Sequence, residues 1–194
     1  MSSADTTPDP KTQLLDRARV ALVFIDLQYK LLATMYEQQR VLSNCALLLR
    51  LASVLQLPVI LTTQYAGGLG GIHPEILSLA DGVRPFDKVS FSCFGDTNFA
   101  RHLSDEAPQA NTLLLAGVES HICVAQTALG AIAAGYLVHV AADAASSRTL
   151  VNWQLGLERM ERAGAVIVSA EMAAYELLGR AGTPEFKAML PHLK

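Results

Sequence analysis

The sequence predicts an α/β protein, built as a three-layer α/β/α sandwich around a central, mostly parallel sheet. Short continuous apolar runs, typical of strands buried on both faces, alternate with segments whose apolar residues recur at helical spacing. Strands separated by helices pair in parallel through right-handed crossovers, which puts helices on both faces of the sheet. No repeat or low-complexity linker interrupts this alternation after residue 15. We therefore expect a flexible leader over residues 1–15 and a single domain over residues 16–194.

The first part of the chain predicts two strands and a glycine-rich loop. A continuous apolar run predicts a strand over 19–26, which ends at Asp26. Apolar residues at helical spacing predict a helix over 41–56, and a second apolar run predicts a strand over 58–63. The glycines of the loop over 66–71 match neither of the common phosphate-binding patterns. This loop either shapes or covers a crevice or is a plain flexible turn.

The middle of the chain combines an extended segment with a strand and an unusually apolar helix. We expect an extended segment over 86–91, a short helix over 96–103 and a buried strand over 112–116. The helix expected over 125–134 is apolar nearly all round, so either the interior of the monomer or a second copy of the chain must bury it. We expect a homo-oligomer, a dimer or a tetramer.

The last part of the chain continues the alternation. Gly135 and Gly164 each stop a helix ahead of a strand, and Ser169 is the expected N-cap of the next helix. The expected elements are a strand over 135–143, a helix over 148–163, a strand over 165–168, a helix over 169–178 and one short helix in the tail over 183–194.

The composition argues against several classes of function. The net charge is −3, and the sequence contains no basic run, so we expect neither nucleic acid nor an anionic membrane as a partner. No apolar stretch reaches the roughly 18–20 residues that span a bilayer. The polar first ten residues do not resemble a secretory signal. Cys45, Cys93 and Cys123 form no zinc spacing and no Cys-x-x-Cys pair, which favours free thiols and a cytoplasmic location.

Cys123 is the first candidate for chemistry. It lies within the first turn of an expected helix, just past the carboxyl end of the strand over 112–116, where α/β proteins usually bind their ligands. Free backbone N–H groups and the positive end of the helix dipole favour a thiolate there. The alternative is an inert thiol, since cysteine is among the most buried residue types.

Two charged residues could complete a site around this thiol. Asp26 ends a buried strand, where a carboxylate needs a partner or a ligand, although it could also form a turn or a helix cap. Lys88 lies among Phe86, Val89 and Phe91, where an ammonium group is unusual unless it points to water. If the three side chains converge at one edge of the sheet, they place a base, a cation and a thiol in one crevice.

From about residue 18 to residue 178, the chain resembles the isochorismatase-like cysteine hydrolases. Several short motifs in the expected order are more specific than any one of them. They lie over residues 23–28, 58–65, 88–92, 117–124 and 142–144. Segments 64–71, 119–123 and 142–148 are most similar to the branch of isochorismatase domain-containing proteins, whose physiological substrates are poorly defined.

The resemblance implies a catalytic triad of Asp26, Lys88 and Cys123. Asp26 would take the thiol proton and pass it to a leaving amine, while Lys88 would stabilise the thiolate and keep Asp26 ionised. Cys123 would attack a carbonyl and form a thioester that water then hydrolyses. Backbone N–H groups in the turn over 119–123 could form an oxyanion hole, and the family pattern implies a cis peptide bond between Val118 and Glu119.

Departures from the family pattern narrow the expected chemistry. Residues 63–66 read Thr-Gln-Tyr-Ala where some members carry an Asp-x-His metal motif, so we expect no catalytic metal and no cofactor. The presence of Cys123 favours attack on an amide-like or ester-like carbonyl of a small molecule over cleavage of isochorismate. The candidate substrate-binding residues are Gln28, Gln64, Tyr65, Phe91 and His121.

Two other classes of function compete with a hydrolase. One is a binding or scaffold protein that keeps the fold and a silent site, and the intact Asp26, Lys88 and Cys123 argue against it. The other is a redox-sensing thiol, which would need a second cysteine close to Cys123.

Overall fold

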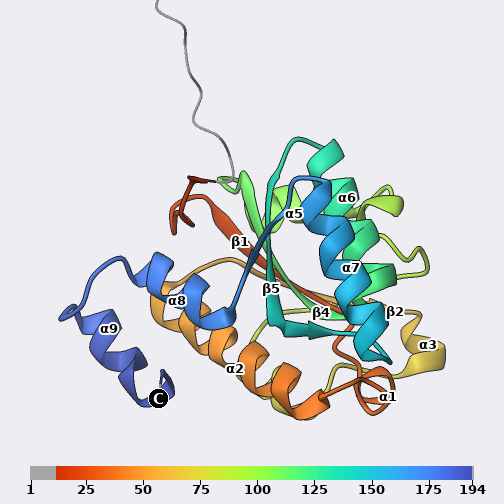
Figure 1. Cartoon of the computed structure of the whole chain (residues 1–194), viewed down its shortest axis with the longest axis horizontal. Helices are drawn as coiled ribbons and strands as arrows, with labels where there is room; N and C mark the ends of the chain where they lie inside the picture. Colours follow the sequence, from red (N-terminus) through yellow and green to blue (C-terminus); the bar gives the residue numbers. More distant parts are fainter. Residues whose placement is uncertain (1–11, 194) are drawn as a thin grey trace, which may run out of the picture.

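The central sheet has six strands, all parallel, in the order β3-β2-β1-β4-β5-β6 (Figure 1). The structure is a computed structural model and describes residues 12–193. The expected three-layer α/β/α architecture is confirmed. The strands are β1 Val20–Ile25, β2 Val59–Gln64, β3 Phe86–Lys88, β4 Thr112–Val118, β5 Leu137–Ser146 and β6 Val166–Val168.

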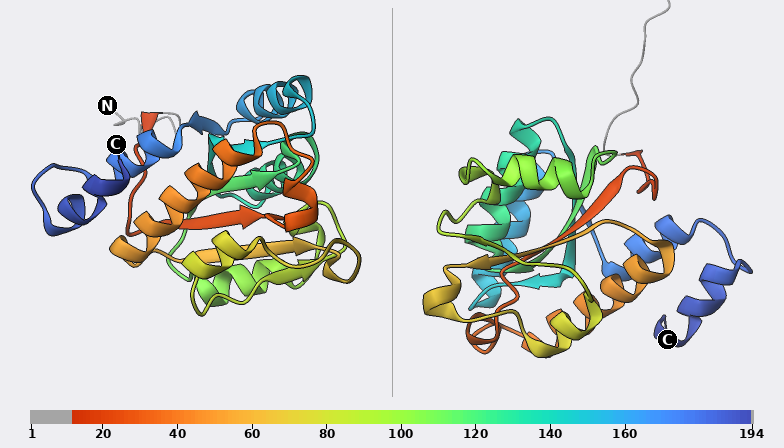
Figure 2. Two further views of the ribbon diagram at one scale, coloured as in Figure 1. Left: turned by 90° about the horizontal axis from the view of Figure 1, so that it is seen from below. Right: turned by 180° about the vertical axis from the view of Figure 1, so that it is seen from behind.

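Helices cover both faces of this sheet, as Figure 2 shows from two further directions. Buried side chains of α2, α4, α8 and α9 pack on one face, and those of α5, α6 and α7 pack on the other. The helices are α1 Tyr29–Leu32, α2 Gln38–Leu55, α3 Ala66–Leu69, α4 Pro74–Leu79, α5 Phe99–Glu106, α6 Ala125–Ala133, α7 Leu150–Arg162, α8 Ala170–Leu178 and α9 Pro184–Met189. The shorter elements include the 3₁₀ turns Cys93–Gly95 and Leu190–His192 and the π-helical turn Ser120–Val124.

Strand β1 shows why its sequence is continuously apolar. All six of its residues are buried. Leu22 and Phe24 point into one core, while Val23 and Ile25 point into the other. A central strand with helices on both faces has no side chain left for solvent, so its sequence loses the polar alternation of a half-exposed strand.

The order of the strands predicts a crevice at the carboxyl ends of β1 and β4. The chain builds β1, β2 and β3 outward in one direction, then returns to place β4 beside β1 and builds β5 and β6 outward in the other. Loops that leave two neighbouring strands in opposite directions leave a gap between them, which is where open α/β sheets bind ligands.

Strand β5 is longer than the sequence indicates. It continues to Ser146 instead of ending at residue 143, and its register with β4 shifts between Leu115 and Gly117. Arg40 supports this extension, because its guanidinium group donates to the carbonyls of Ala142, Asp143 and Ala145 and stacks on Trp153, 4.5 Å from the ring centroid.

The monomer buries most of the apolar helix α6. Thr127, Ala128 and Ala131 are buried, and Leu129 and Ile132 pack partly against the same core. The apolar character of this helix therefore does not require a second copy of the chain, and the homo-oligomer stays a prediction.

The first eleven residues of the expected leader lie outside the described part of the chain. Leu15, near the end of that segment, is buried, and its backbone N–H donates to the Glu176 carboxylate. Within residues 12–193, the helices are too short or too polar to cross a membrane.

Candidate active site

Three strands bring Asp26, Lys88 and Cys123 to the carboxyl edge of the sheet. Asp26 directly follows β1, Lys88 is the last residue of β3, and Cys123 lies in the π-helical turn after β4. The Lys88 ammonium lies 2.8 Å from Asp26 Oδ2, and neither side chain has exposed surface. The charges of Asp26 and Lys88 both act on the Cys123 thiol, which lies beside them. A base, a cation and a thiol therefore meet at one place.

The Lys88 ammonium group has an acceptor for each of its three protons. Besides Asp26, it donates to Gln64 Oε1 at 3.0 Å and to the Phe91 carbonyl at 3.2 Å. Gln64 Nε2 donates to the Val89 carbonyl, which fixes Oε1 toward the lysine. With its protons taken, Lys88 acts on the thiol through its charge rather than through a hydrogen bond.

Backbone geometry aims Asp26 into the crevice. Asp26 has a left-handed backbone with φ of 57°, so its side chain leaves the direction of β1. Gly117 of β4 pairs with Ile25 beside it. A Cβ on Gly117, whose φ is 138°, would lie 2.2 Å from the Ile25 carbonyl oxygen. Only glycine allows the two strands to approach this closely next to the base.

The two glutamines predicted to bind substrate are used inside the protein. Gln28 donates to the carbonyls of Gln64 and Gly70 and accepts from the Gln64 N–H, so it ties the end of β2 to the glycine-rich loop. Both glutamine side chains are buried. Their hydrogen bonds hold the site together, and their contact with a ligand stays a prediction.

Tyr65 and Phe91 lie at the rim of the site. Their side chains are 58% and 54% exposed, so they are free to touch a ligand or another chain. The glycine-rich loop packs against aromatic rings, since a Cβ on Gly68 would lie 2.4 Å from the Tyr65 ring. Lys30 Nζ donates to the Gly68 carbonyl, which pins the loop further. These contacts favour a loop that shapes the rim over a plain flexible turn.

His121 turns away from the thiol. Its Nδ1 lies 2.9 Å from Ser147 Oγ and 3.5 Å from Glu119 Oε2, and Glu119 Oε1 is ion-paired with Arg148 Nε at 2.9 Å. This cluster joins the cysteine turn to the connection between β5 and α7. The structure therefore brings His121 close to Glu119 and Arg148, and not into the Asp26–Lys88 pair.

The cysteine turn differs from the sequence prediction. All peptide bonds in residues 12–193 are trans, so the predicted cis bond between Val118 and Glu119 is wrong for this structure. Instead, Glu119 has a left-handed backbone with φ of 57°, and its carbonyl accepts from the N–H groups of Ile122 and Val124. Those two N–H groups are therefore unavailable to an oxyanion hole.

The π-helical turn is held closely against its surroundings. Ser120 Oγ donates to the carbonyl of Ser146 at the end of β5. A Cβ on Gly156 of α7 would lie 2.7 Å from the backbone of Ser120, so this glycine permits close packing of α7 against the turn. Single-turn π-helices are frequent at functional sites, and neither this turn nor its supports are visible in the sequence pattern.

Burial dominates the ionisation of the thiol. Burial, followed by the negative charge of Asp26, raises the pKa of Cys123 well above its ordinary value, while Lys88 acts in the opposite direction. The thiol is therefore protonated at rest, contrary to the thiolate that its position at a helix start favours. A base must remove the proton before the sulfur can attack.

Two residues behind the triad were not singled out in the sequence. Thr62 Oγ1 donates to Asp26 Oδ1 at 2.8 Å. The N–H of Cys93 donates to Thr127 Oγ1, one helical turn after Cys123, and burial raises the pKa of the Cys93 thiol to about 11. Only the packing of the 3₁₀ turn Cys93–Gly95 against α6 brings Cys93 near the site.

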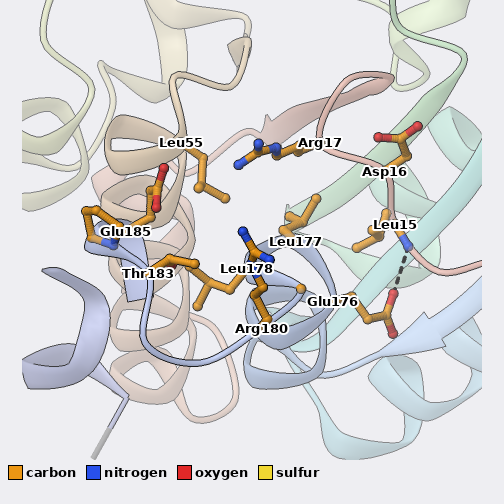
Figure 3. A pocket seen from close by; sticks show the side chains of 12 residues that line it. Leu15, Asp16, Arg17, Leu55, Glu176, Leu177, Leu178, Arg180, Thr183 and Glu185 are labelled. Carbon is orange, nitrogen blue, oxygen red and sulfur yellow. Dashed lines mark hydrogen bonds between the residues drawn. The ribbon is translucent and has the colours of Figure 1, made fainter. Parts of the chain in front are cut away.

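A pocket of about 690 Å³ lies at the opposite edge of the sheet (Figure 3). Arg17 precedes β1 and faces Arg180 from the end of α8, with Glu185 of α9 beside them. Its lining contains neither a cysteine nor a histidine, so it offers neither a thiol nor an imidazole for nucleophilic chemistry. Among residues 12–193, no group of three metal-ligating side chains could hold a metal ion.

Comparisons with known proteins point to one family. The sequence model of the isochorismatase domain matches residues 20–172. The secreted isochorismatase effector Isc1 of Phytophthora sojae is 43% identical over 146 residues, which cover 74% of this chain and 69% of Isc1. Isochorismatase domain-containing protein 2 of Bos taurus is 36% identical over 166 residues, which cover 86% of this chain and 78% of the relative.

Solved structures show the same fold over nearly the whole chain. The structure of MAR1 ribonuclease from Caenorhabditis elegans is 29% identical, with a TM-score of 0.86, and the match covers 93% of this chain and 92% of that one. The YcaC gene product of Escherichia coli, described as an octameric hydrolase of unknown specificity, is 26% identical, with a TM-score of 0.83 and the same coverage.

Proposed function

The chain belongs to the isochorismatase family, and from this premise we propose that it is a cysteine hydrolase that cleaves a C–N bond in a small carbonyl substrate. The observation that carries the proposal is the placement of the Cys123 thiol beside the fully buried Asp26–Lys88 ion pair. Removing two charges from water costs several kcal/mol per ion, and losing either partner of a buried pair costs on the order of 3–5 kcal/mol. Such a pair beside a thiol is therefore better explained by a catalytic role than by stability.

Attack begins with transfer of the thiol proton. The Asp26 carboxylate accepts the proton from Cys123 as the sulfur attacks the substrate carbonyl carbon, so the thiolate never has to exist free in the buried site. Lys88 keeps a positive charge beside both groups, which opposes the burial and carboxylate effects on the thiol. The electron pair of the carbonyl π bond moves to oxygen and forms a tetrahedral oxyanion.

The oxyanion needs N–H donors from the cysteine turn. The Ile122 and Val124 donors are committed to the Glu119 carbonyl, so we assign the hole to the remaining N–H groups of the turn, beginning with that of Cys123. One such donor contributes about 3–4 kcal/mol to the transition state in hydrolases.

Collapse of the intermediate then releases the first product. The C–N bond breaks, and the leaving amine takes the proton from Asp26 while Cys123 keeps the acyl group as a thioester. Water attacks the thioester and gives its proton to Asp26, and the released sulfur recovers that proton. The sum is one amide and one water converted into one carboxylic acid and one amine or ammonia.

The charges at the site favour a neutral substrate over isochorismate. Isochorismate carries two carboxylates, which call for basic side chains with free donors. Lys88 has all three protons committed, and Arg148 is paired with Glu119. An uncharged carboxamide matches a site in which each of these cations already has its anion.

The proposal is tested by replacing the nucleophile and trapping the acyl-enzyme. Wild-type protein should release ammonia from at least one member of a panel of small amides, and rapid acid quench should yield a mass adduct on the peptide that contains Cys123. Cys123→Ala should lose at least about 10³-fold in turnover, while Cys45→Ala keeps its activity. Ligand binding without turnover across the panel would instead support a silent binding protein.

The setting of the activity is proposed from weaker observations. We place the protein in the cytoplasm, since its three cysteines are free and buried. The Phytophthora relative is described as secreted, so fractionation of the source cells is the deciding experiment.

We also propose a homo-oligomer that binds neither nucleic acid nor membrane. It is supported by the octameric Escherichia coli relative and the exposed aromatic rim, and light scattering tests it.

A further inference from the structure

We propose that Thr62 is the positioning residue for the base Asp26, a role that rests on the proposed function of the site. Thr62 belongs to β2, the strand beside β1, and its side chain is completely buried against the base. Its hydroxyl donates to Asp26 Oδ1 at 2.8 Å, while Lys88 donates to Oδ2 at the same distance. Each carboxylate oxygen therefore has one fixed donor.

The direction of the Thr62 hydroxyl is set by its other contacts. The N–H of Asp26 points at both the carbonyl and the hydroxyl oxygen of Thr62, at 3.2 Å and 3.3 Å. A hydroxyl carries one hydrogen and two lone pairs. With the Asp26 N–H approaching a lone pair, the hydrogen is directed to Asp26 Oδ1.

This bond has two consequences for a base. It fixes the rotation of the carboxylate, because two donors on different oxygens determine its plane, so the lone pair that receives the thiol proton keeps its direction. It also stabilises the charged form, since hydrogen bonds to a carboxylate favour the ionised state. Thr62 thereby favours the charged carboxylate that accepts the thiol proton.

The neighbouring threonine provides a matched control. Thr63 is also a buried residue of β2, but its hydroxyl donates to Asp87 Oδ1, away from the base. Replacing either threonine by valine removes one hydroxyl and keeps the branched shape. The two variants therefore lose a similar hydrogen bond, and only one of them loses a contact with Asp26.

The experiment compares Thr62→Val, Thr62→Ser and Thr63→Val in the full chain. Activity is measured against pH on an amide that the wild type hydrolyses. We expect Thr62→Val to lose about 10–100-fold in kcat, with KM nearly unchanged and the acid limb of the profile moved to higher pH. Thr62→Ser should restore the profile, and Thr63→Val should keep it.

A second measurement separates this inference from the proposed function. The rate at which iodoacetamide labels Cys123 is followed against pH by mass spectrometry, which requires no substrate. The acid limb of labelling should move in Thr62→Val and stay in Thr63→Val. If the labelling profiles of Thr62→Val and Thr63→Val are the same while turnover still requires Cys123, the positioning role of Thr62 is overturned and the proposed reaction stands. If the wild type hydrolyses no amide but its labelling profile still changes in Thr62→Val, the proposed reaction is overturned and the positioning role stands.

Discussion

Charged side chains are buried at the carboxyl edge of the sheet and exposed at its amino edge. At the carboxyl edge, Asp26 and Lys88 have no exposed surface, and their hydrogen-bonding groups are satisfied by other groups of the protein. At the amino edge, Arg17 and Arg180 line the pocket of about 690 Å³ and remain exposed. The difference teaches that a pocket by itself does not locate chemistry in this fold. Groups withdrawn from water and held by several fixed partners do so.

The largest expected difference between the edges concerns two glycines with positive φ. A Cβ on Gly117 would meet the Ile25 backbone at the carboxyl edge, whereas a Cβ on Gly179 at the amino edge meets no atom within 4 Å. We expect Gly117→Ala to lower the free energy of unfolding by about 4–6 kcal/mol through strain and overpacking. Gly179→Ala should cost about 1–2 kcal/mol through its left-handed backbone. Urea unfolding measures the free energy of unfolding of both variants. Equal decreases in the two variants would contradict the claim that the carboxyl edge is the more closely packed.

Removing one cation from each edge gives the next largest contrast. Lys88→Met leaves the Asp26 carboxylate buried without its partner and should destabilise the protein by about 3–5 kcal/mol. Arg17→Met removes an exposed charge and should change stability by less than about 0.5 kcal/mol. Thermal and urea unfolding report both changes. A Lys88→Met variant as stable as the wild type would mean that the ion pair is not desolvated.

Alkaline pH should weaken the carboxyl edge through its thiols. Burial raises the pKa of Cys93 from about 9 to about 11. The unfolded thiol therefore ionises above pH 9 while the folded one stays neutral, and stability falls as pH rises. Between pH 9 and pH 11 this one group should remove on the order of 2 kcal/mol. Unfolding curves for wild type and Cys93→Ala test it, and the variant should show the shallower decline.

Acid pH should weaken the amino half of the sheet, by a smaller amount. Burial lowers the pKa of His139 in β5 below its ordinary value, against the opposing charge of Glu176. Below about pH 6.5 the histidine is protonated in the unfolded chain but stays neutral in the folded protein. The free energy of unfolding therefore falls as the pH falls, by at most about 1.4 kcal/mol per pH unit. His139→Gln should flatten the decline between pH 6.5 and pH 5. A slope unchanged by this substitution would assign the acid sensitivity to other groups.

The sequence predicts the framework well because its signals are local. Continuous apolar runs identify buried strands wherever helices cover both faces, and β1 shows it with all six residues buried. The predicted N-cap Ser169 of α8 accepts the N–H of Met172, whereas α7 begins after Thr149 and not at residue 148 as predicted. Short elements such as α1 and α3 were missed, because four residues are too few to show a period.

The site was only partly predictable, because its details depend on approach distances between strands. The motifs indicate Asp26, Lys88 and Cys123 as a group. They do not indicate that the cysteine turn is π-helical with trans peptide bonds, that His121 faces Ser147, or that Thr62 and Cys93 stand behind the base. Each of these follows from how neighbouring strands and helices fit together.

What the sequence by itself determined is which residues end each strand and which family pattern they follow. In a parallel sheet, strand ends share an edge, so that information already places a carboxylate, an ammonium and a thiol at one side of the molecule. What only the tertiary structure decided is their protonation and aim. Burial keeps the thiol neutral, and three acceptors consume the donors of Lys88. Both effects arise because segments that are distant in the sequence pack around the site. No local sequence pattern indicates such packing.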